Sequence, residues 1–214
     1  MGGDRIKSLE WLTRIGNRND MSISLVHLTK ENEINGKEFT ALDILIKIIE
    51  EGVIYGSTTE SGFICGNTPA ICFQETPLYS LAQNIYYENR LRKENKTKKV
   101  RYQGYGLRFY KDLIYRSGGR PVIYDRTSDA KRYLKESQWW RIVNLEINDC
   151  KNIIDWTHER EWRIPGDFKF EKSDVSIIIT GEKNRNKLID HFKIKDIDID
   201  KEVRSIINIE DILF

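Results

Sequence analysis

The chain has 214 residues, of which 39% are hydrophobic and 11% aromatic, enough for one filled core or one core with short appendages. Its 35 Lys and Arg residues against 33 Asp and Glu residues give a net charge of only +2. The overall field therefore excludes a strong general attraction to polyanions, and any such attraction must be local. Polar residues interrupt every apolar stretch, so we expect neither a membrane span nor a secretory signal.

The cysteines predict free thiols rather than a disulfide framework. Cys65, Cys72 and Cys150 are odd in number and lack the spacing of metal ligands. Free thiols are typical of a reducing compartment, so we expect a cytoplasmic protein without a metal site.

The N-terminal segment predicts a helix attached to a single domain. Residues 5–15 repeat apolar side chains on one helical face, and Gly16 ends the pattern. We expect residues 1–20 to form a helical appendage and residues 21–214 to form one domain.

The next elements are predicted from periodicity and from capping residues. Residues 22–29 have the apolar pattern of a buried strand. The segment TALDILIKIIEEG predicts a helix with Thr40 as its N-cap and Gly52 at its end. A loop punctuated by glycine leads to a strand at residues 70–74, and Pro77 opens a helix that runs towards Tyr87.

The rest of the chain mixes strands and helices without the regular βαβ alternation of a dinucleotide-binding domain, which predicts an α+β fold. Trp139 and Trp140, expected on one strand, should face core and partner surface respectively. Strands are predicted at residues 105–110, 120–125, 139–147, 161–165 and 174–180, and helices near residues 127–137 and 184–192.

Three motifs occur in a recognisable order. LVHLT, ILIKIIEEGV and GNTPAICFQETPLYSLAQN follow one another between residues 25 and 84. This succession resembles ADP-ribosyltransferases of the poly(ADP-ribose) polymerase and DarT branches. In those proteins a His-bearing strand, a helix ending in Gly, a glycine loop, an aromatic strand and a further helix precede a Glu on a later strand. The segments YGLRFYKDLIYRSGGRPVIYD and HEREWRIPGDF are also similar to AbiGi-type abortive-infection proteins.

The resemblance implies split sheets around a central NAD cleft, with NAD as substrate and no metal. It implies that His27, Phe73 and Glu161 line one concave pocket. His27 would donate to a ribose hydroxyl, and Ser80 matches the serine of the following helix. Phe73 and Tyr86 would sandwich the nicotinamide, and Arg120 or Arg163 would bind the pyrophosphate bidentately. Leu28 and Cys72 depart from the family, which has Gly and Tyr there.

The segment HEREWRIP, residues 158–165, holds the candidate catalytic residues. Glu159 and Glu161 are two residues apart and would share one strand face. Cleavage between nicotinamide and ribose develops positive charge on the sugar, which a carboxylate such as Glu161 stabilises, while Glu159 would orient the acceptor or act as a base. The alternative is that these charges only pair with Arg160 and Arg163 along a strand edge.

One local stretch favours nucleic acid. Residues 88–101 carry seven basic and two acidic side chains and lie beside Tyr102 and Tyr105. Basic groups next to aromatic rings suit a single strand, although such a run also fits a solvated helix end. The residues that we expect to contact nucleic acid are Lys96, Lys98, Lys99 and Arg101.

Together these patterns predict a cytoplasmic NAD-dependent ADP-ribosyltransferase, a phage-defence or toxin effector that modifies nucleic acid. An antitoxin or a phage-derived trigger protein is a further expected partner, and no membrane is expected. Two alternatives stay open. One is an NAD glycohydrolase, in which water is the acceptor. The other is a catalytically inactive binding module or antitoxin of an abortive-infection system, which the departures at Leu28 and Cys72 favour.

Overall fold

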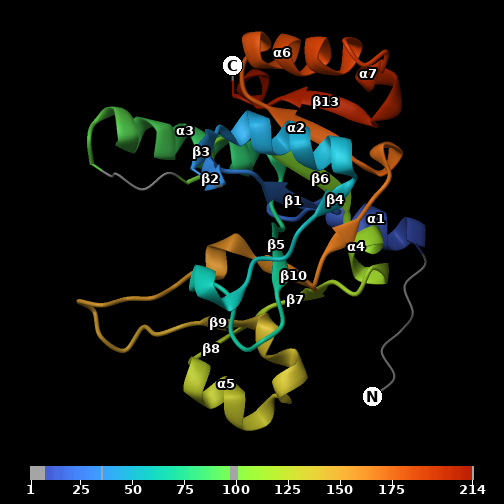
Figure 1. Ribbon diagram of the computed structural model, residues 1–214. Coiled ribbons are helices and arrows are strands. Elements are labelled where there is room, and N and C mark those ends of the chain that lie inside the picture. The colour runs from blue at the N-terminus through green and yellow to red at the C-terminus, as the bar shows by residue number, and fades with distance from the viewer. Residues whose placement is uncertain (1–7, 35, 97–100, 214) are drawn as a thin grey trace.

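A seven-stranded sheet forms the centre of the computed structural model, which describes residues 8–34, 36–96 and 101–213 (Figure 1). The strand order is β13-β12-β6-β1-β5-β10-β7. β12 and β13 are parallel, and the other neighbours are antiparallel. The strands are β1 (Ser24–Leu28), β5 (Ala70–Gln74), β6 (Gly106–Tyr110), β7 (Arg120–Pro121), β10 (Glu161–Pro165), β12 (Ser176–Ile179) and β13 (Ser205–Asn208).

Helices and small sheets surround this sheet, so the chain is mixed α and β, as predicted. Three two-stranded sheets are β2 (Asn32–Ile34) with β3 (Lys37–Phe39), β4 (Val53–Ile54) with β11 (Phe168–Lys169), and β8 (Ile123–Asp125) with β9 (Ile142–Asn144). The α-helices are α1 (Ser8–Gly16), α2 (Ala41–Glu51), α3 (Leu78–Lys93), α4 (Lys111–Arg116), α5 (Thr127–Tyr133), α6 (Glu182–Lys193) and α7 (Ile199–Glu202). The 3-10 helices are η1 (Thr59–Ser61), η2 (Glu136–Arg141), η3 (Thr157–Glu159), η4 (Lys172–Asp174) and η5 (Ile209–Ile212).

The two faces of the sheet bury different helices. On one face, here called the α2 face, Leu25, Phe73 and Leu107 pack with side chains of α2 and α6 in the largest core cluster. On the opposite face, the α3 face, Val26 and Ile178 pack against α3 and η5. Because side chains alternate along a strand, one register fixes the face of every residue on β1, β5 and β10. β8, β9 and α5 lie at the end of the molecule away from α6 and α7 (Figure 1).

The caps of α2 confirm the sequence prediction. The Thr40 hydroxyl accepts from the Asp43 backbone N–H at 3.2 Å, and the Asp43 carboxylate accepts from the Thr40 backbone N–H at 2.9 Å. Gly52 ends the helix in the left-handed region, at φ 62°, and its N–H donates to the Ile48 carbonyl. These caps satisfy backbone groups that a helix end leaves open.

The prediction that Trp139 and Trp140 lie on a strand is wrong. Both belong to η2, and β9 begins only at Ile142. The Trp139 indole donates to the Leu134 carbonyl just before η2, and the Trp140 indole donates to the Ser137 carbonyl within η2. These local hydrogen bonds favour the 3-10 turn over a strand. Trp140 is buried and Trp139 is half-buried, so the expectation that Trp139 faces the core and Trp140 a partner surface is also wrong. In the described part of the chain, no helix combines the length and apolarity needed to cross a bilayer.

We predict that Gly106→Ala destabilises the fold, because β6 and β1 approach closely at this position. A Cβ atom there would lie 2.3 Å from the His27 carbonyl oxygen and 2.9 Å from Leu28 Cδ2. We expect a loss of about 1–3 kcal/mol in the free energy of unfolding, measured by urea denaturation. Gly16→Ala is the matched control, since a Cβ atom there meets nothing within 4 Å. Equal effects of the two substitutions would contradict the close approach.

Candidate acid cluster on the α3 face

The register of β10 places Glu161 on the α3 face. Glu161 lies opposite Gln74 of β5, and Arg163 lies opposite Cys72. Trp162, between the two charged residues, lies opposite Phe73 on the α2 face. The strand part of HEREWRIP therefore places Trp162 on one side of the sheet and Glu161 and Arg163 on the other.

Arg163 anchors Glu161 in a buried ion pair. Arg163 Nε lies 2.7 Å from Glu161 Oε1, with the side chains only 3% and 14% exposed. The rest of the guanidinium donates to the carbonyls of Trp140 at 2.8 Å, Ile142 at 3.2 Å and Phe63 at 3.2 Å. With its donors engaged in this way, Arg163 is not free to bind a pyrophosphate, and that expectation is corrected. Its role here is to hold a carboxylate in a fixed place.

Two further groups surround Glu161. Its backbone N–H donates to the Tyr124 hydroxyl oxygen at 2.8 Å, which joins β8 to the start of β10. Burial, and then the Glu161 carboxylate, raise the pKa of the Cys72 thiol to about 12. Cys72 is therefore a neutral thiol at physiological pH and does not supply a thiolate nucleophile.

Glu159 has an environment unlike that of Glu161. It ends η3, and Arg160 follows in the left-handed region at φ 43°, so the expectation that both carboxylates lie on one strand face is wrong. Burial, and then the charge of Glu161, raise the pKa of Glu159 to about 7, while Arg101 opposes the rise. His158 Nε2 lies 3.7 Å from Glu159 Oε1. One carboxylate is thus paired with a buried cation, and the other is poised to exchange a proton near neutral pH.

We call Cys72, Gln74, Tyr124, Glu159, Glu161 and Arg163 the acid cluster. Of these residues, sequence patterns had given a role in the site only to the two glutamates and the arginine. Cys72, Gln74 and Tyr124 join them through the pairing of β5 with β10 and through the placement of β8. Since strand register is set by the whole fold, no local signal in the sequence places these three residues there.

His27 and Phe73 lie together, but not with Glu161. Their ring centroids are 5.7 Å apart, and His27 lies opposite Leu107 on the α2 face. His27 Nδ1 donates to the Cys72 carbonyl at 2.9 Å, and burial lowers the pKa of the ring. Phe73, at 2% exposed, packs edge-to-face with Phe109 and Phe168. The expectation that His27, Phe73 and Glu161 line one pocket is therefore wrong, because the sheet separates them.

The remaining expected NAD contacts are dispersed. Ser80 lies half-buried in the first turn of α3. Arg120 donates to the carbonyls of Tyr115 and Gly119 and lies over the Tyr115 ring at 4.1 Å, so its guanidinium faces the end of α4.

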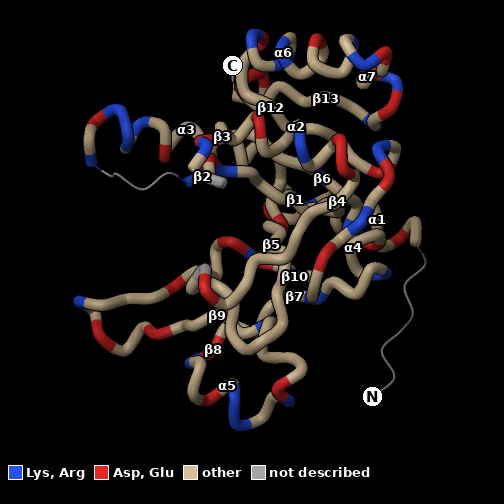
Figure 2. Tube along the Cα trace, viewed as in Figure 1, with Lys and Arg blue, Asp and Glu red and all other residues tan. Residues whose placement is uncertain are grey.

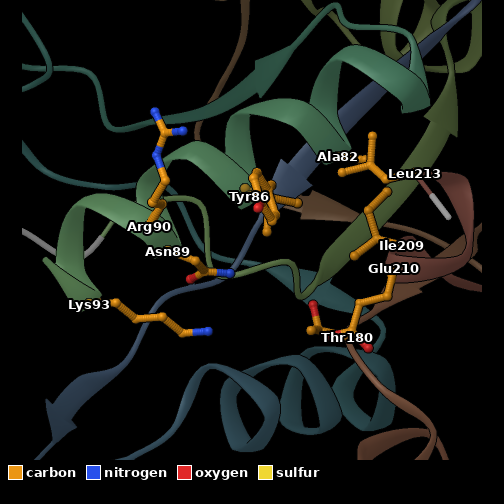
Figure 3. A pocket seen from close by; sticks show the side chains of 10 residues that line it. Ala82, Tyr86, Asn89, Arg90, Lys93, Thr180, Ile209, Glu210 and Leu213 are labelled. Carbon is orange, nitrogen blue, oxygen red and sulfur yellow. The ribbon is translucent and has the colours of Figure 1, made fainter.

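Tyr86 lines a separate pocket of about 360 Å³ between α3 and the C-terminal segment (Figure 3). Asn89 and Lys93 approach it from α3, and Thr180 and Glu210 approach it from the other side. Its apolar lining is Ala82, Ile85, Ile209 and Leu213. None of the acid cluster lines this pocket.

Residues 88–96 of the basic stretch lie at the C-terminal end of α3 and just after it (Figure 2). Lys96 is exposed and pairs with Glu94 at 2.7 Å, whereas Lys98 and Lys99 lie outside the described residues. Arg101 stacks over the Trp156 ring at 5.0 Å, and His158 lies beside that ring at 5.9 Å between centroids. Arg101 and Trp156 thus stand close enough to Glu159 for Arg101 to influence its charge.

No family model, curated protein or solved structure matches the chain. Among the described residues, no three His, Cys, Asp or Glu side chains are grouped to hold a metal ion. Function is therefore inferred from the acid cluster and from the order of motifs along the chain.

The raised pKa of Glu159 predicts a pH-dependent stability. The folded state keeps a proton that the unfolded chain releases above its ordinary pKa of 4.5, so stability falls as pH rises from about 4.5 to about 7. Glu159→Gln should remove this dependence. The substitution should change the free energy of unfolding little at pH 4 and raise it by on the order of 3 kcal/mol at pH 8.

Chemical denaturation at the two pH values measures this difference. Glu38→Gln, an exposed carboxylate on β3, is the control. A Glu159→Gln variant that is less stable than the original protein at pH 8 would show that Glu159 is a stabilising, paired carboxylate.

Proposed function

We propose that the protein is an NAD-dependent ADP-ribosyltransferase whose chemistry takes place at the acid cluster. The observation that carries the proposal is the unequal pair of carboxyl groups, Glu161 held by buried Arg163 and Glu159 with a pKa of about 7. A carboxylate held in a fixed place beside a carboxyl group that can exchange a proton near neutral pH is the combination that glycosyl transfer requires. The finer fold assignment, split sheets around an NAD cleft, belongs to the same proposal.

The roles follow from the two environments. As the bond between nicotinamide and ribose breaks, its electron pair leaves with nicotinamide and positive charge develops on the sugar. Glu161, fixed at the start of β10, accepts a hydrogen bond from a ribose hydroxyl and stabilises that charge. Glu159, which can accept a proton near pH 7, takes it from the acceptor hydroxyl or amine as the new bond to ribose forms.

The order of elements supports NAD as the donor. β1, β5 and β10, which carry the His, aromatic and Glu motifs, are neighbours in the sheet although far apart in the chain. α2 ends at a left-handed Gly52, and α3 follows β5 directly, as in the succession that the motifs resemble. Similarity to AbiGi-type proteins further supports a cytoplasmic role in phage defence or as a toxin.

Arg101 and Trp156 support nucleic acid as the acceptor. A guanidinium stacked on an indole, with His158 beside it, is suited to contact both a phosphate and a base. This group lies next to Glu159, the proposed base, so a bound strand would present its nucleophile at the carboxyl group that must deprotonate it.

A non-catalytic binding module is the second candidate, and one observation favours it. His27 and Phe73 lie on the α2 face, across the sheet from Glu161, so the family's NAD contacts do not converge. In this alternative the Glu161–Arg163 pair only joins β10 to its surroundings, and the chain binds a partner protein such as a toxin.

We predict that Glu161→Asp reduces NAD consumption by at least about a hundredfold while the fold is retained. Aspartate keeps the negative charge that Arg163 needs but withdraws the carboxylate by one methylene, so the pair remains neutral and the sugar contact is lost. Turnover of labelled NAD measures activity, and thermal unfolding checks the fold. Asp112→Asn, which removes an exposed carboxylate on α4, is the control.

Glu161→Gln is a second variant, since it removes the charge and leaves Arg163 unpaired. It should both abolish NAD consumption and lower stability by roughly 3–5 kcal/mol. Unchanged NAD consumption by either glutamate variant, or no consumption by the original protein, would favour the binding module.

We predict that neutralising Lys96 and Arg101 together, as Gln, weakens modification of nucleic acid and flattens its salt dependence. Losing two phosphate contacts should reduce the slope of log affinity against log salt by roughly 1.4 for a single strand. Labelled NAD is incubated with single-stranded DNA, RNA and cell protein in separate reactions, and the label is followed. Lys183→Gln with Lys187→Gln, exposed on α6, is the control pair. Label found only on protein would refute the acceptor, and label released only as free ADP-ribose would identify a glycohydrolase.

A further inference from the structure

Unpartnered buried polar atoms occur next to the acid cluster. Among the described residues, the buried side-chain nitrogen and oxygen atoms without a hydrogen-bond partner are Gln74 Nε2, Gln74 Oε1 and Ser24 Oγ. Gln74 is 6% exposed and Ser24 is 1% exposed. Both amide positions of one glutamine thus lack partners, although buried polar groups in proteins are nearly always paired.

The sheet register places these atoms beside Glu161. Gln74 lies opposite Glu161 on β10 and opposite Val26 on β1. Residues opposite each other share a face, with Cβ atoms about 4.5–5.5 Å apart. Ser24 is two residues from Val26 on β1 and lies on the same face. The unpartnered atoms therefore belong to one polar region of the α3 face, next to the proposed catalytic carboxylate.

An unpaired amide in this place has an energetic cost. A buried donor or acceptor without a hydrogen-bond partner lowers stability by about 1–3 kcal/mol. An apolar side chain of similar length would carry no such penalty. Polar groups that persist at such a cost are often those that a ligand uses. Arg163 already satisfies Glu161 Oε1, so the ion pair does not explain why Gln74 is there.

We propose that Gln74 is a substrate-binding residue that recognises the carboxamide of the leaving nicotinamide. A glutamine amide offers one acceptor and one donor group, which complement the donor and acceptor of a primary carboxamide. In the proposed reaction Glu161 contacts the ribose to which the nicotinamide is bonded. The carboxamide of that nicotinamide would therefore lie near β5, the strand next to Glu161, which carries Gln74. Because both amide atoms are enclosed, in this proposal neighbouring side chains must move when the donor binds. This inference rests on the proposed NAD chemistry at Glu161.

The test is Gln74→Met, which keeps the length of the side chain and removes both polar atoms. The substitution removes unsatisfied groups, so it should raise the melting temperature. It should also reduce kcat/KM for NAD by roughly 10- to 100-fold, because the carboxamide loses its partner. A structural glutamine would instead lose stability and activity together. Gln83→Met, the same substitution at an exposed position of α3, should change neither.

Substrate discrimination tests the carboxamide directly. The original protein should prefer NAD to its deamidated analogue, nicotinic acid adenine dinucleotide, because a carboxylate lacks the N–H donor that the Gln74 amide oxygen would accept from. Gln74→Met should bring the ratio of the two kcat/KM values close to one. A variant that keeps the preference, or that is less stable than the original protein, overturns the assignment of Gln74.

A binding measurement separates this inference from the proposed function. If the original protein does not consume NAD, the transferase proposal fails. The melting temperatures of the original protein and of Gln74→Met are then measured in the presence of nicotinamide and in the presence of nicotinic acid. Stabilisation of the original protein by nicotinamide, absent in Gln74→Met, would support Gln74 as the residue that binds the carboxamide. An equal shift in melting temperature for the original protein and the variant would refute it.

Discussion

The buried ion pair between Arg163 and Glu161 is the interaction on which the rest of the site depends. Its 2.7 Å contact sits at the start of β10, and the same guanidinium reaches carbonyls of η2, of β9 and of the glycine-rich loop. Segments distant in the chain are thereby tied to one carboxylate. A buried pair of this kind adds little to stability compared with apolar residues of similar volume, but it fixes geometry, which a charge-stabilising carboxylate needs.

Sheet register decides which residues accompany that carboxylate. On β5, alternation sends Phe73 into the aromatic core and Gln74 towards Glu161. Trp162 turns to the opposite face, where its indole donates to Glu75, which also pairs with buried Lys111 at 2.7 Å. The α2 face thus holds Trp162 through a hydrogen bond to Glu75, and the α3 face holds Glu161, Arg163 and Gln74. A single residue of slip would exchange the two sets.

Local signals in the sequence predicted most of the elements, but not the strand face on which each side chain lies, and they misplaced Trp139 and Trp140 on a strand. Thr40 and Gly52 bracket α2 because capping is chemistry within a few residues, and the charged and aromatic alternation of HEREWRIP marks β10. The position of His27 depended instead on pairing with β5 and β6, which no local pattern encodes. The placement of Glu159 was also mispredicted, because the left-handed Arg160 interrupts the strand that would have aligned it with Glu161.

The central claim is that NAD reacts at the α3 face of the sheet, between Glu161, Glu159 and Gln74. A crystal structure of the protein with NAD tests it most directly. We predict the nicotinamide ribose within hydrogen-bonding distance of the Glu161 carboxylate and the carboxamide against Gln74. NAD bound beside His27 on the α2 face, or in the pocket between α3 and the C-terminal segment, would contradict the claim.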